Sequence, residues 1–202
     1  MTDLAERDLT TESKGERTRR RILEIAIERF GSRGYRGTSV SEIARAAGLT
    51  QAASYAYFDS KESLFQAAVD TDAHGLLEEV GAQVRGIPAK DLIPSIILFA
   101  VIGLGSHPLA QRVLAGQEPD EIPRLVELPA IRLIGELIAA ELAIAQTRGE
   151  VRADLNPAIL AAGIESLIMG ILFTTVQTGG AATERHQIGV VEAFDLMIRP
   201  PS

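Results

Sequence analysis

The chain has 202 residues, of which 46% are hydrophobic and 4% are aromatic, and its formal net charge at pH 7 is −7. It contains no cysteine, which excludes a thiol nucleophile, a thiolate-bound zinc ion and a disulfide framework. A net negative charge, taken over the whole chain, also argues against a protein that binds nucleic acid.

The charge is distributed unevenly along the chain. Residues 1–12 carry one Arg against four acidic residues, a net charge of −3. Residues 13–65 carry ten Lys or Arg against six acidic residues, a net charge of +4, and the remainder carries nine against seventeen, a net charge of −8. A basic segment on an acidic protein favours one end that approaches phosphate. We predict a disordered tail at 1–13, a small basic domain at 14–65 and a larger domain at 66–202.

The first predicted helix begins within or shortly before a basic cluster at residues 14–21, which includes Arg17. Ile22, Ala26 and Phe30 follow at the three- and four-residue spacing of a buried helix face. The basic end of this helix could contact phosphates or a minor groove, or it could be an ordinary exposed run of charges.

A second helix is predicted to begin near residue 40, because either Ser39 or Ser41 can cap its N-terminus. Its apolar residues recur on one face, while Arg45 points elsewhere. Gly48 follows the last apolar residue of that face. A left-handed conformation at this glycine would end the helix and turn the chain sharply.

A third helix, predicted over Gln51–Tyr57, is capped by Thr50 and is about two turns long. Its side chains are small or polar and bury little surface, so another molecule must approach it closely. Gln51 can pair with a base such as adenine, and Tyr55 and Tyr57 offer hydroxyl groups to phosphate oxygens. This chemistry is typical of a helix that lies in the major groove of DNA.

Lys61 is predicted at the start of the next helix, where a phosphate is also favoured. Two helices joined by a glycine turn also occur in bundles that never contact nucleic acid, so the pattern gains weight only with these side chains. The residues predicted to contact DNA are Arg17, Thr38, Ser39, Arg45, Thr50, Gln51, Ala52, Ala53, Tyr55, Tyr57 and Lys61.

The segment GLTQAASYAYFDSK, residues 48–61, resembles the helix-turn-helix of the tetracycline-repressor (TetR) family, whose members carry a G-[LV]-[ST]-x-x-x-x-Y-x-[YH]-F-x-[SN]-K run. Residues 21–48 also resemble that family's first two helices and their link. Ser54 departs from the pattern, because an apolar residue usually precedes the tyrosine. Ala53 and Ala56 stand where family members often place polar or basic contacts. The resemblance implies a DNA-binding transcriptional regulator, and these alanines imply that its third helix reads few bases.

Beyond Lys61 the apolar pattern predicts helices alone, and the whole chain is predicted to be all-α. The resemblance implies a three-helix helix-turn-helix DNA-binding domain followed by a larger helical domain for ligand binding and dimerisation. No apolar run reaches the eighteen charge-free residues of a membrane span, and Glu165 interrupts the longest one, so we expect a buried helix there. The predicted helices are 62–84, 92–104, 108–115, 121–148, 157–178 and 183–198.

The last two predicted helices carry more apolar surface than a small bundle needs to bury. The resemblance implies that they pair with their copies in a four-helix bundle, and Gly163 and Gly170 would permit close approach. A homodimer would place two reading helices on a pseudo-palindromic operator. Alternatively, these faces pack only within one chain. The residues predicted at the dimer interface are Ile164, Leu167, Ile168, Ile171, Val191, Phe194 and Ile198.

Residues 96–105 are apolar nearly all round, and the resemblance places them where TetR proteins bind their effector. Gly103 and Gly105 could leave room for a ligand, or they could let neighbouring helices touch within a plain core. The aliphatic surroundings favour a ligand that is mainly apolar and uncharged. The residues predicted to bind it are Phe99, Ile102, Gly103, Leu128, Arg132 and Phe173.

Nothing in the sequence indicates catalysis. The three histidines are spread over separate elements, without the spacing of a metal site. No signal peptide or lipidation motif is present, so we expect a cytoplasmic protein. We predict a homodimeric repressor, not an enzyme, with no cofactor and no metal, which a small apolar effector releases from double-stranded DNA. The alternative is a helical regulator or interaction protein whose C-terminal domain binds a protein partner and no small molecule.

Overall fold

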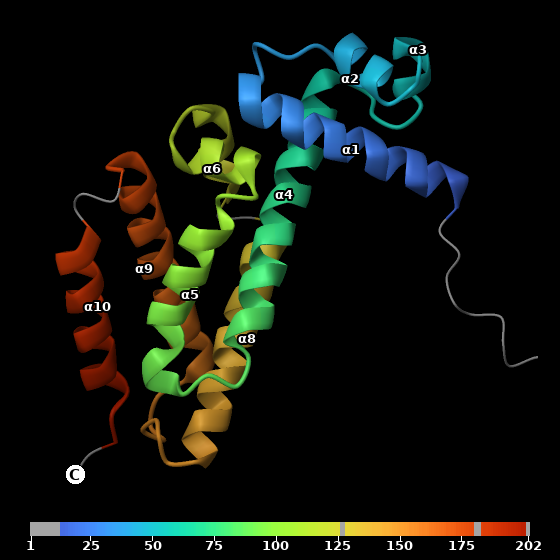
Figure 1. The fold of residues 1–202 in the computed structure, drawn as a ribbon. Coiled ribbons are helices and arrows are strands. Elements are labelled where there is room, and N and C mark those ends of the chain that lie inside the picture. The colour runs from blue at the N-terminus through green and yellow to red at the C-terminus, as the bar shows by residue number, and fades with distance from the viewer. Residues whose placement is uncertain (1–12, 126–127, 180–182, 201–202) are drawn as a thin grey trace, which may run out of the picture.

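The computed structural model describes residues 13–125, 128–179 and 183–200. Within these ranges every regular element is a helix (Figure 1), which confirms the all-α prediction. The tail predicted at 1–13 lies outside the described residues except for Ser13, which caps the first helix.

The N-terminal part contains α1 (Lys14–Arg33), α2 (Val40–Ala46) and α3 (Gln51–Ser54). The prediction that the third helix extends to Tyr57 is wrong, because α3 is a single turn. After Ser54 the backbone N–H groups of Ala56 and Tyr57 donate to carbonyl oxygens only three residues earlier, at 3.3 and 3.0 Å. This tighter turn ends the α-helical hydrogen-bond pattern and leads the chain toward the next helix.

The long helix α4 (Lys61–Val84) joins this N-terminal part to the rest of the molecule. One face of α4 is buried along the helix, from Leu64 to Val84, and the boundary predicted between residues 65 and 66 falls inside it. One continuous hydrophobic core extends through the described residues, from α1 to the last helix. The two predicted domains are therefore connected by a shared helix, with no flexible linker between them.

The remaining helices are α5 (Ala89–Gly103), α6 (Pro108–Leu114), the 3₁₀ turn η1 (Pro119–Glu121), α7 (Ile122–Leu125), α8 (Pro129–Thr147), α9 (Pro157–Gln177) and α10 (Thr183–Ile198). The single helix predicted at 121–148 is wrong. Pro129 begins a new helix, and Leu128 before it is extended, with φ −60° and ψ 130°. A residue before proline is driven out of the helical region, which explains the break.

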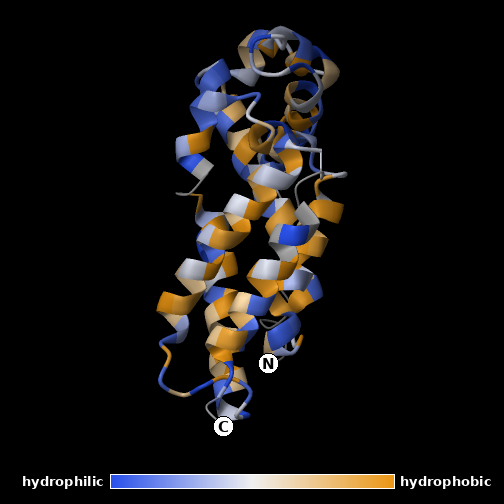
Figure 2. Ribbon diagram, turned by 90° about the vertical axis from the view of Figure 1, so that its left-hand side faces the viewer, coloured by the Kyte–Doolittle hydropathy of each residue, from blue (hydrophilic) through white to orange (hydrophobic). Residues whose placement is uncertain are grey.

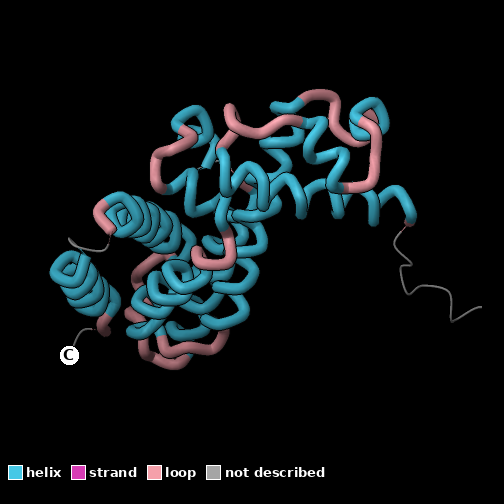
Figure 3. Tube along the Cα trace, turned by 45° about the horizontal axis from the view of Figure 1, so that its top comes forward, coloured by secondary structure: helices cyan, strands magenta, loops and turns pink. Residues whose placement is uncertain are grey.

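In the larger part, α4, α5, α8 and α9 pack around a common core, and α10 lies at its outer edge against α5 and α9 (Figures 1 and 3). The axes of α5 and α6 are bent by 113°. This bend carries α6 across to α1 and α4, so that α6 contacts both the N-terminal helices and the larger bundle. The short helix α6 is therefore the bridge between the two parts.

The contact between α1 and α6 depends on Gly31. A Cβ atom at this position would lie 2.8 Å from Cβ of Pro108 and 3.2 Å from its carbonyl carbon. These atoms belong to a rigid ring and to the backbone, so they have little freedom to move aside. The missing side chain thus allows the two helices to pack closely.

We predict that Gly31→Ala lowers the free energy of unfolding by about 1–3 kcal/mol, because α1 and α6 must separate. Gly15→Ala in the same helix is the matched control, since a Cβ there meets only Oγ of Ser13, at 3.9 Å. It should stabilise the protein by up to about 1 kcal/mol, through the higher helix propensity of alanine. Denaturant unfolding followed by circular dichroism checks both values, and equal effects of the two substitutions would contradict the close contact.

Candidate nucleic-acid interface and effector cavity

The turn between α2 and α3 has the geometry that the sequence predicted. Gly48 adopts a left-handed conformation with φ 77°. The backbone N–H groups of Gly48 and Leu49 donate to carbonyl oxygens in the last turn of α2, at 3.0 and 2.8 Å, which closes the helix. Thr50 then caps α3 by accepting a hydrogen bond from the backbone N–H of Ala53 at 3.1 Å.

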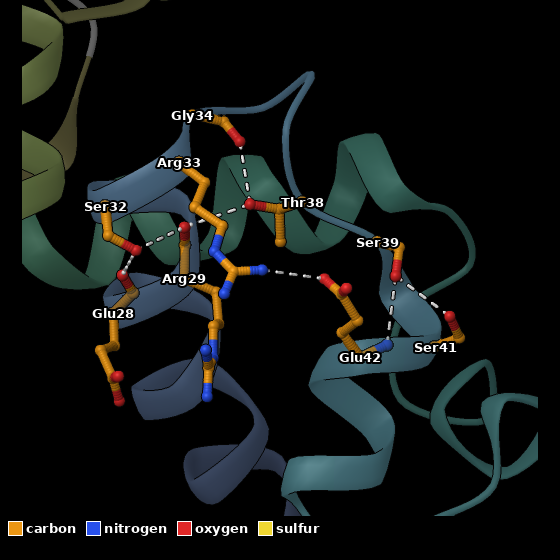
Figure 4. Close-up of polar contacts among 9 residues, drawn as sticks. All are labelled: Glu28, Arg29, Ser32, Arg33, Gly34, Thr38, Ser39, Ser41 and Glu42. Carbon is orange, nitrogen blue, oxygen red and sulfur yellow. Dashed lines mark hydrogen bonds and ion pairs between the residues drawn. The ribbon is translucent and has the colours of Figure 1, made fainter.

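The start of α2 is held by two residues predicted to contact DNA (Figure 4). Thr38 is only 3% exposed, and its hydroxyl donates to the carbonyl oxygens of Arg29 and Gly34 at 3.1 and 2.9 Å. Oγ of Ser39 accepts from the backbone N–H of Glu42 at 3.2 Å. The prediction for Thr38 is therefore corrected: its hydroxyl is occupied inside the protein and positions α2 relative to α1, while Ser39 is the helix cap.

The surface of α3 is formed by small and polar groups. Thr50, Gln51 and Ala52 are exposed, and Ala53 is half-buried. Ser54, at a position that is usually apolar in the family pattern, is 2% exposed, and its hydroxyl donates to the carbonyl oxygen of Gln51 at 2.7 Å. This internal hydrogen bond satisfies the buried hydroxyl, so the helix tolerates serine there.

Aromatic and basic residues follow α3 and surround its end. Tyr55 is exposed and Tyr57 is half-buried against the core. Lys61 is the first residue of α4, and its ammonium nitrogen lies 4.4 Å from the centre of the Tyr35 ring. In α1, the guanidinium of Arg19 lies 4.9 Å from the ring centre of Phe58. These cation–π contacts hold positive charge beside α3 in defined positions.

The interface therefore combines side chains from four helices at one end of the molecule, where α2 and α3 lie across α1 (Figure 1). Arg17 and Arg45 are exposed, on α1 and α2 respectively. Of the residues predicted to contact DNA, only Thr38 is buried. Arg19 belongs to the same basic cluster in α1 and is also exposed.

The bacterial regulatory proteins of the tetR family provide a family model that matches residues 22–68. The HTH-type transcriptional regulator UidR of Escherichia coli (strain K12) is 26% identical over 163 residues, which cover 80% of this chain and 83% of that protein. The HTH-type transcriptional repressor KstR2 of Rhodococcus jostii (strain RHA1) is 33% identical over 131 residues, which cover 64% and 61%. A solved structure concerned with the control of antibiotic production by bacterial hormones matches with a TM-score of 0.66 and 26% identity, covering 91% of this chain and 98% of that one.

The chain carries the DNA-binding domain of the TetR family. It is a DNA-binding transcriptional regulator, and its helix-turn-helix is the segment from α2 to α3. The solved structure extends the agreement in fold to the larger helical part of this TetR protein.

The residues predicted to bind an effector of this TetR protein differ in how far they are exposed. Ile102 is 64% exposed on α5, and Arg132 is exposed on α8. Leu128 is buried, while Phe99 and Phe173 pack partly buried against the core. None of them lines either of the two hollows described below.

Gly103 explains part of this difference. A Cβ at this position would lie 2.6 Å from Cδ1 of Leu76, so the space beside the glycine is filled by α4. Of the two alternatives for this glycine, close contact between neighbouring helices is the one that the structure contains.

A small cavity of about 40 Å³ lies between α4, α5, α8 and α9. The apolar segment predicted at 96–105 contributes Ile96 and Ala100 to the cavity wall. The predicted helix therefore faces the cavity, but through residues other than the predicted Phe99, Ile102 and Gly103. A larger groove of about 430 Å³ lies between α4 and α8. Leu77 and Ile134 line both hollows, so these two side chains stand between the groove and the cavity.

Glu165 on α9 is the one charged residue in the cavity wall. Burial raises the pKa of its carboxyl group above the ordinary value for glutamate, because the apolar surroundings disfavour the charged form. No hydrogen bond or ion pair connects Glu165 to any other residue that the structure describes. The signal for this residue was present in the sequence as a lone carboxylate in an apolar helix.

The predicted dimer residues are mostly internal. Ile164, Phe194 and Ile198 are almost fully buried within the chain, and Ile168 and Ile171 are also buried. These five predictions are therefore corrected, because helices of the same chain already cover the residues. Leu167 is exposed and Val191 is half-buried, so these two are accessible to a partner.

Proposed function

We propose that this TetR protein is a homodimeric repressor that binds a pseudo-palindromic operator and leaves it when a mainly apolar small molecule occupies the larger helical part. The proposal rests on the capped turn between α2 and α3, which holds exposed Gln51 at the start of α3. The relative KstR2 is named a transcriptional repressor, which supports repression as the sign of regulation. A regulator of this kind acts in the cytoplasm, where it meets DNA.

The contacts to DNA divide into two kinds. Gln51 is exposed in the first turn of α3, where its amide can form two hydrogen bonds to adenine in the major groove. Tyr55, Tyr57 and Lys61 contact phosphates and fix the position of the protein on the duplex. Because α3 is a single turn with exposed alanine, thymine methyl contacts and DNA shape contribute the rest of the sequence preference.

The dimer face is formed by α9 and α10. The helix α9 is long and apolar enough to cross a membrane. Only 28% of its most apolar window is buried inside the chain, so most of this window is not covered by the other helices. Its exposed side carries Ile159 and Leu167 together with Gly163 and Gly170, and open space surrounds both glycines. Figure 2 shows apolar residues on this side of the molecule. The exposed apolar residues of α10 are Ile188, Leu196 and Met197.

A second copy of the chain suits this face better than solvent does. The exposed stripe on α9 from Ala158 to Thr174 is free of charge, and its small residues permit close packing of a helix. A two-fold axis through such a face relates the two copies of α3. Their half-sites are then about 34 Å apart or slightly more, one turn of the double helix.

Ligand control requires that the effector prefers a conformation in which the two copies of α3 no longer fit successive grooves. DNA and ligand then weaken each other's binding by the same factor. The cavity and the groove beside α4 support this coupling, because α4 also begins at the proposed phosphate contact of Lys61.

We predict that the full chain selects a palindromic sequence from random duplex DNA. Gln51→Ala should select a less restricted sequence, because the base contact is lost. Lys61→Ala should select the same sequence but bind every duplex more weakly, with a salt dependence smaller by about one phosphate contact. Fluorescence anisotropy at several salt concentrations measures the affinities.

Lys90→Ala is the control for charge, because Lys90 is exposed at the start of α5, away from the helix-turn-helix. It should bind DNA like the natural protein. Selection of no sequence at all, or of an asymmetric one, would refute the proposed function. The assignment of roles would be refuted if Gln51→Ala weakened binding to every duplex equally and Lys61→Ala relaxed the selected sequence.

We predict that Leu167→Glu converts the protein to a monomer of 21.6 kDa and weakens operator binding by at least about tenfold, because a charge on the dimer face must lose water to be buried. Leu133→Glu is the matched control, since Leu133 is exposed to a similar degree on α8, beside the groove. Analytical ultracentrifugation gives the mass. If both variants stay dimeric, or if the natural protein is a monomer, the interface is not the one proposed.

A further inference from the structure

The cavity between α4, α5, α8 and α9 combines an apolar wall with a single carboxylate. Leu77 and Val80 of α4 and Ile138 of α8 are representative of the wall, which is otherwise formed by aliphatic side chains and one methionine. Glu165 is the exception. Apolar sites with one or a few polar groups are typical of small-molecule binding, because the polar group fixes the orientation of the ligand.

Gly135 on α8 makes the room for this carboxylate. A Cβ at position 135 would lie 1.5 Å from Oε1 of Glu165 and 2.7 Å from its carboxyl carbon, so no other residue permits this conformation of Glu165. The carboxylate therefore lies directly against the backbone of α8. Gly135 thus leaves room for the carboxylate between two helices of the cavity wall.

Glu165 is half-buried, and the protein gives its carboxylate no partner. Among the described residues, no Lys, Arg or His pairs with Glu165, and no donor forms a hydrogen bond with it. Burial makes the charged form less favourable there, and the raised pKa of the group has the same cause. A carboxylate in apolar surroundings is costly unless a cation or hydrogen-bond donors satisfy it.

A ligand can approach the cavity from the groove between α4 and α8. The volume of the groove, about 430 Å³, is within the range of small-molecule sites, whereas the cavity of about 40 Å³ accommodates only a small group. Leu77 and Ile134 line both the groove and the cavity, so a change in the conformation of these two side chains would connect the groove to the cavity. The outer groove is lined by further charged or titratable residues, which are His74, Glu78, Arg85 and Glu136.

We propose that this site binds a ligand with an aliphatic body and a primary ammonium group, and that the ammonium pairs with Glu165. An ammonium carries three donors and a full positive charge, and a charge-assisted hydrogen bond is about twice as strong as a neutral one. The aliphatic body contacts the apolar wall and extends through the position of Leu77 and Ile134 into the groove. The inference rests on the proposed function and deepens it, because it names the chemical class of the effector. It replaces the uncharged ligand expected from the sequence with a cationic one.

The test compares three probes of equal chain length, n-octylammonium, n-octanol and octanoate, titrated into the full chain by calorimetry. The natural protein should bind the ammonium at least about tenfold more tightly than the alcohol, and octanoate most weakly. Glu165→Gln should remove the preference for the ammonium and leave the affinity for octanol within about twofold. Glu150→Gln, at an exposed position after α8 that lines neither hollow, is the matched control and should keep the preference.

Gly135→Ala is a second variant that retains Glu165 but displaces its carboxylate, and it should also lose the ammonium preference. Circular dichroism verifies that each variant is folded. Equal affinity for the three probes, no binding of any probe, or an ammonium preference that survives both Glu165→Gln and Gly135→Ala overturns the proposal.

Binding to the selected duplex, measured with and without n-octylammonium, separates this inference from the proposed function. If the ammonium preference depends on Glu165 while DNA affinity does not change, the ligand class is correct and ligand-controlled repression is not. If DNA binding is present and the ammonium preference is absent, the regulator stands and the assigned ligand class is wrong.

Discussion

Asp72 in α4 holds the first turn of α6, and the position of the DNA-binding helices depends on this contact. Its carboxylate is 4% exposed. Oδ2 accepts hydrogen bonds from the backbone N–H groups of Leu109 and Ala110 at 2.9 and 2.8 Å, and Oδ1 lies 3.0 Å from Nδ1 of His107. Free N–H groups at a helix N-terminus favour a negative charge, so the carboxylate and the helix stabilise each other. Through α6, which packs on Gly31 of α1, Asp72 connects the larger bundle to the helix-turn-helix.

A second connection lies beyond α6. Oε1 of Glu118 accepts hydrogen bonds from Nε of Arg112 at 2.7 Å and from the backbone N–H of Tyr35 at 3.1 Å. Gly34, with φ 74°, leaves the space that these two side chains fill. The end of α1 is thus attached to the segment that follows α6. Together with Asp72, this contact leaves the N-terminal helices little freedom to turn independently of the bundle. In the proposed function, a change in the bundle is passed to the N-terminal helices through α4 and α6. Leu77 at the cavity lies about 24 Å along α4 from Lys61, the proposed phosphate contact, at 1.5 Å per residue.

The local features of the helix-turn-helix could be predicted because each depends on neighbouring residues. Gly48 ends α2 and Thr50 caps α3 through interactions that span a few positions, and the sequence contains both partners. The length of α3 and the burial of Thr38 could not be predicted in the same way. The hydroxyl of Thr38 is satisfied by carbonyl oxygens at the end of α1, and only the path of the loop between α1 and α2 brings these groups together.

The functional residues of the larger part were harder to predict, because apolar residues look alike in sequence whichever neighbour they contact. Ile164 and Leu167 are three positions apart on α9, yet the first is buried in the chain and the second is exposed. The space beside Gly103 on α5 is filled by Leu76 of α4. Glu165 differs, because its carboxylate breaks the apolar pattern, although its position against Gly135 depends on how α8 and α9 pack.

The connection through Asp72 is tested most directly by the DNA affinity of Asp72→Asn. Asparagine retains one acceptor oxygen but places an amide donor among buried N–H groups, which leaves a buried donor unsatisfied. We predict that the variant keeps its helix content and binds the selected duplex about tenfold more weakly, whereas Asp91→Asn, at an exposed position in the first turn of α5, binds like the natural protein. Unchanged DNA affinity in a folded Asp72→Asn protein would show that α6 does not orient the DNA-binding helices and would contradict this account.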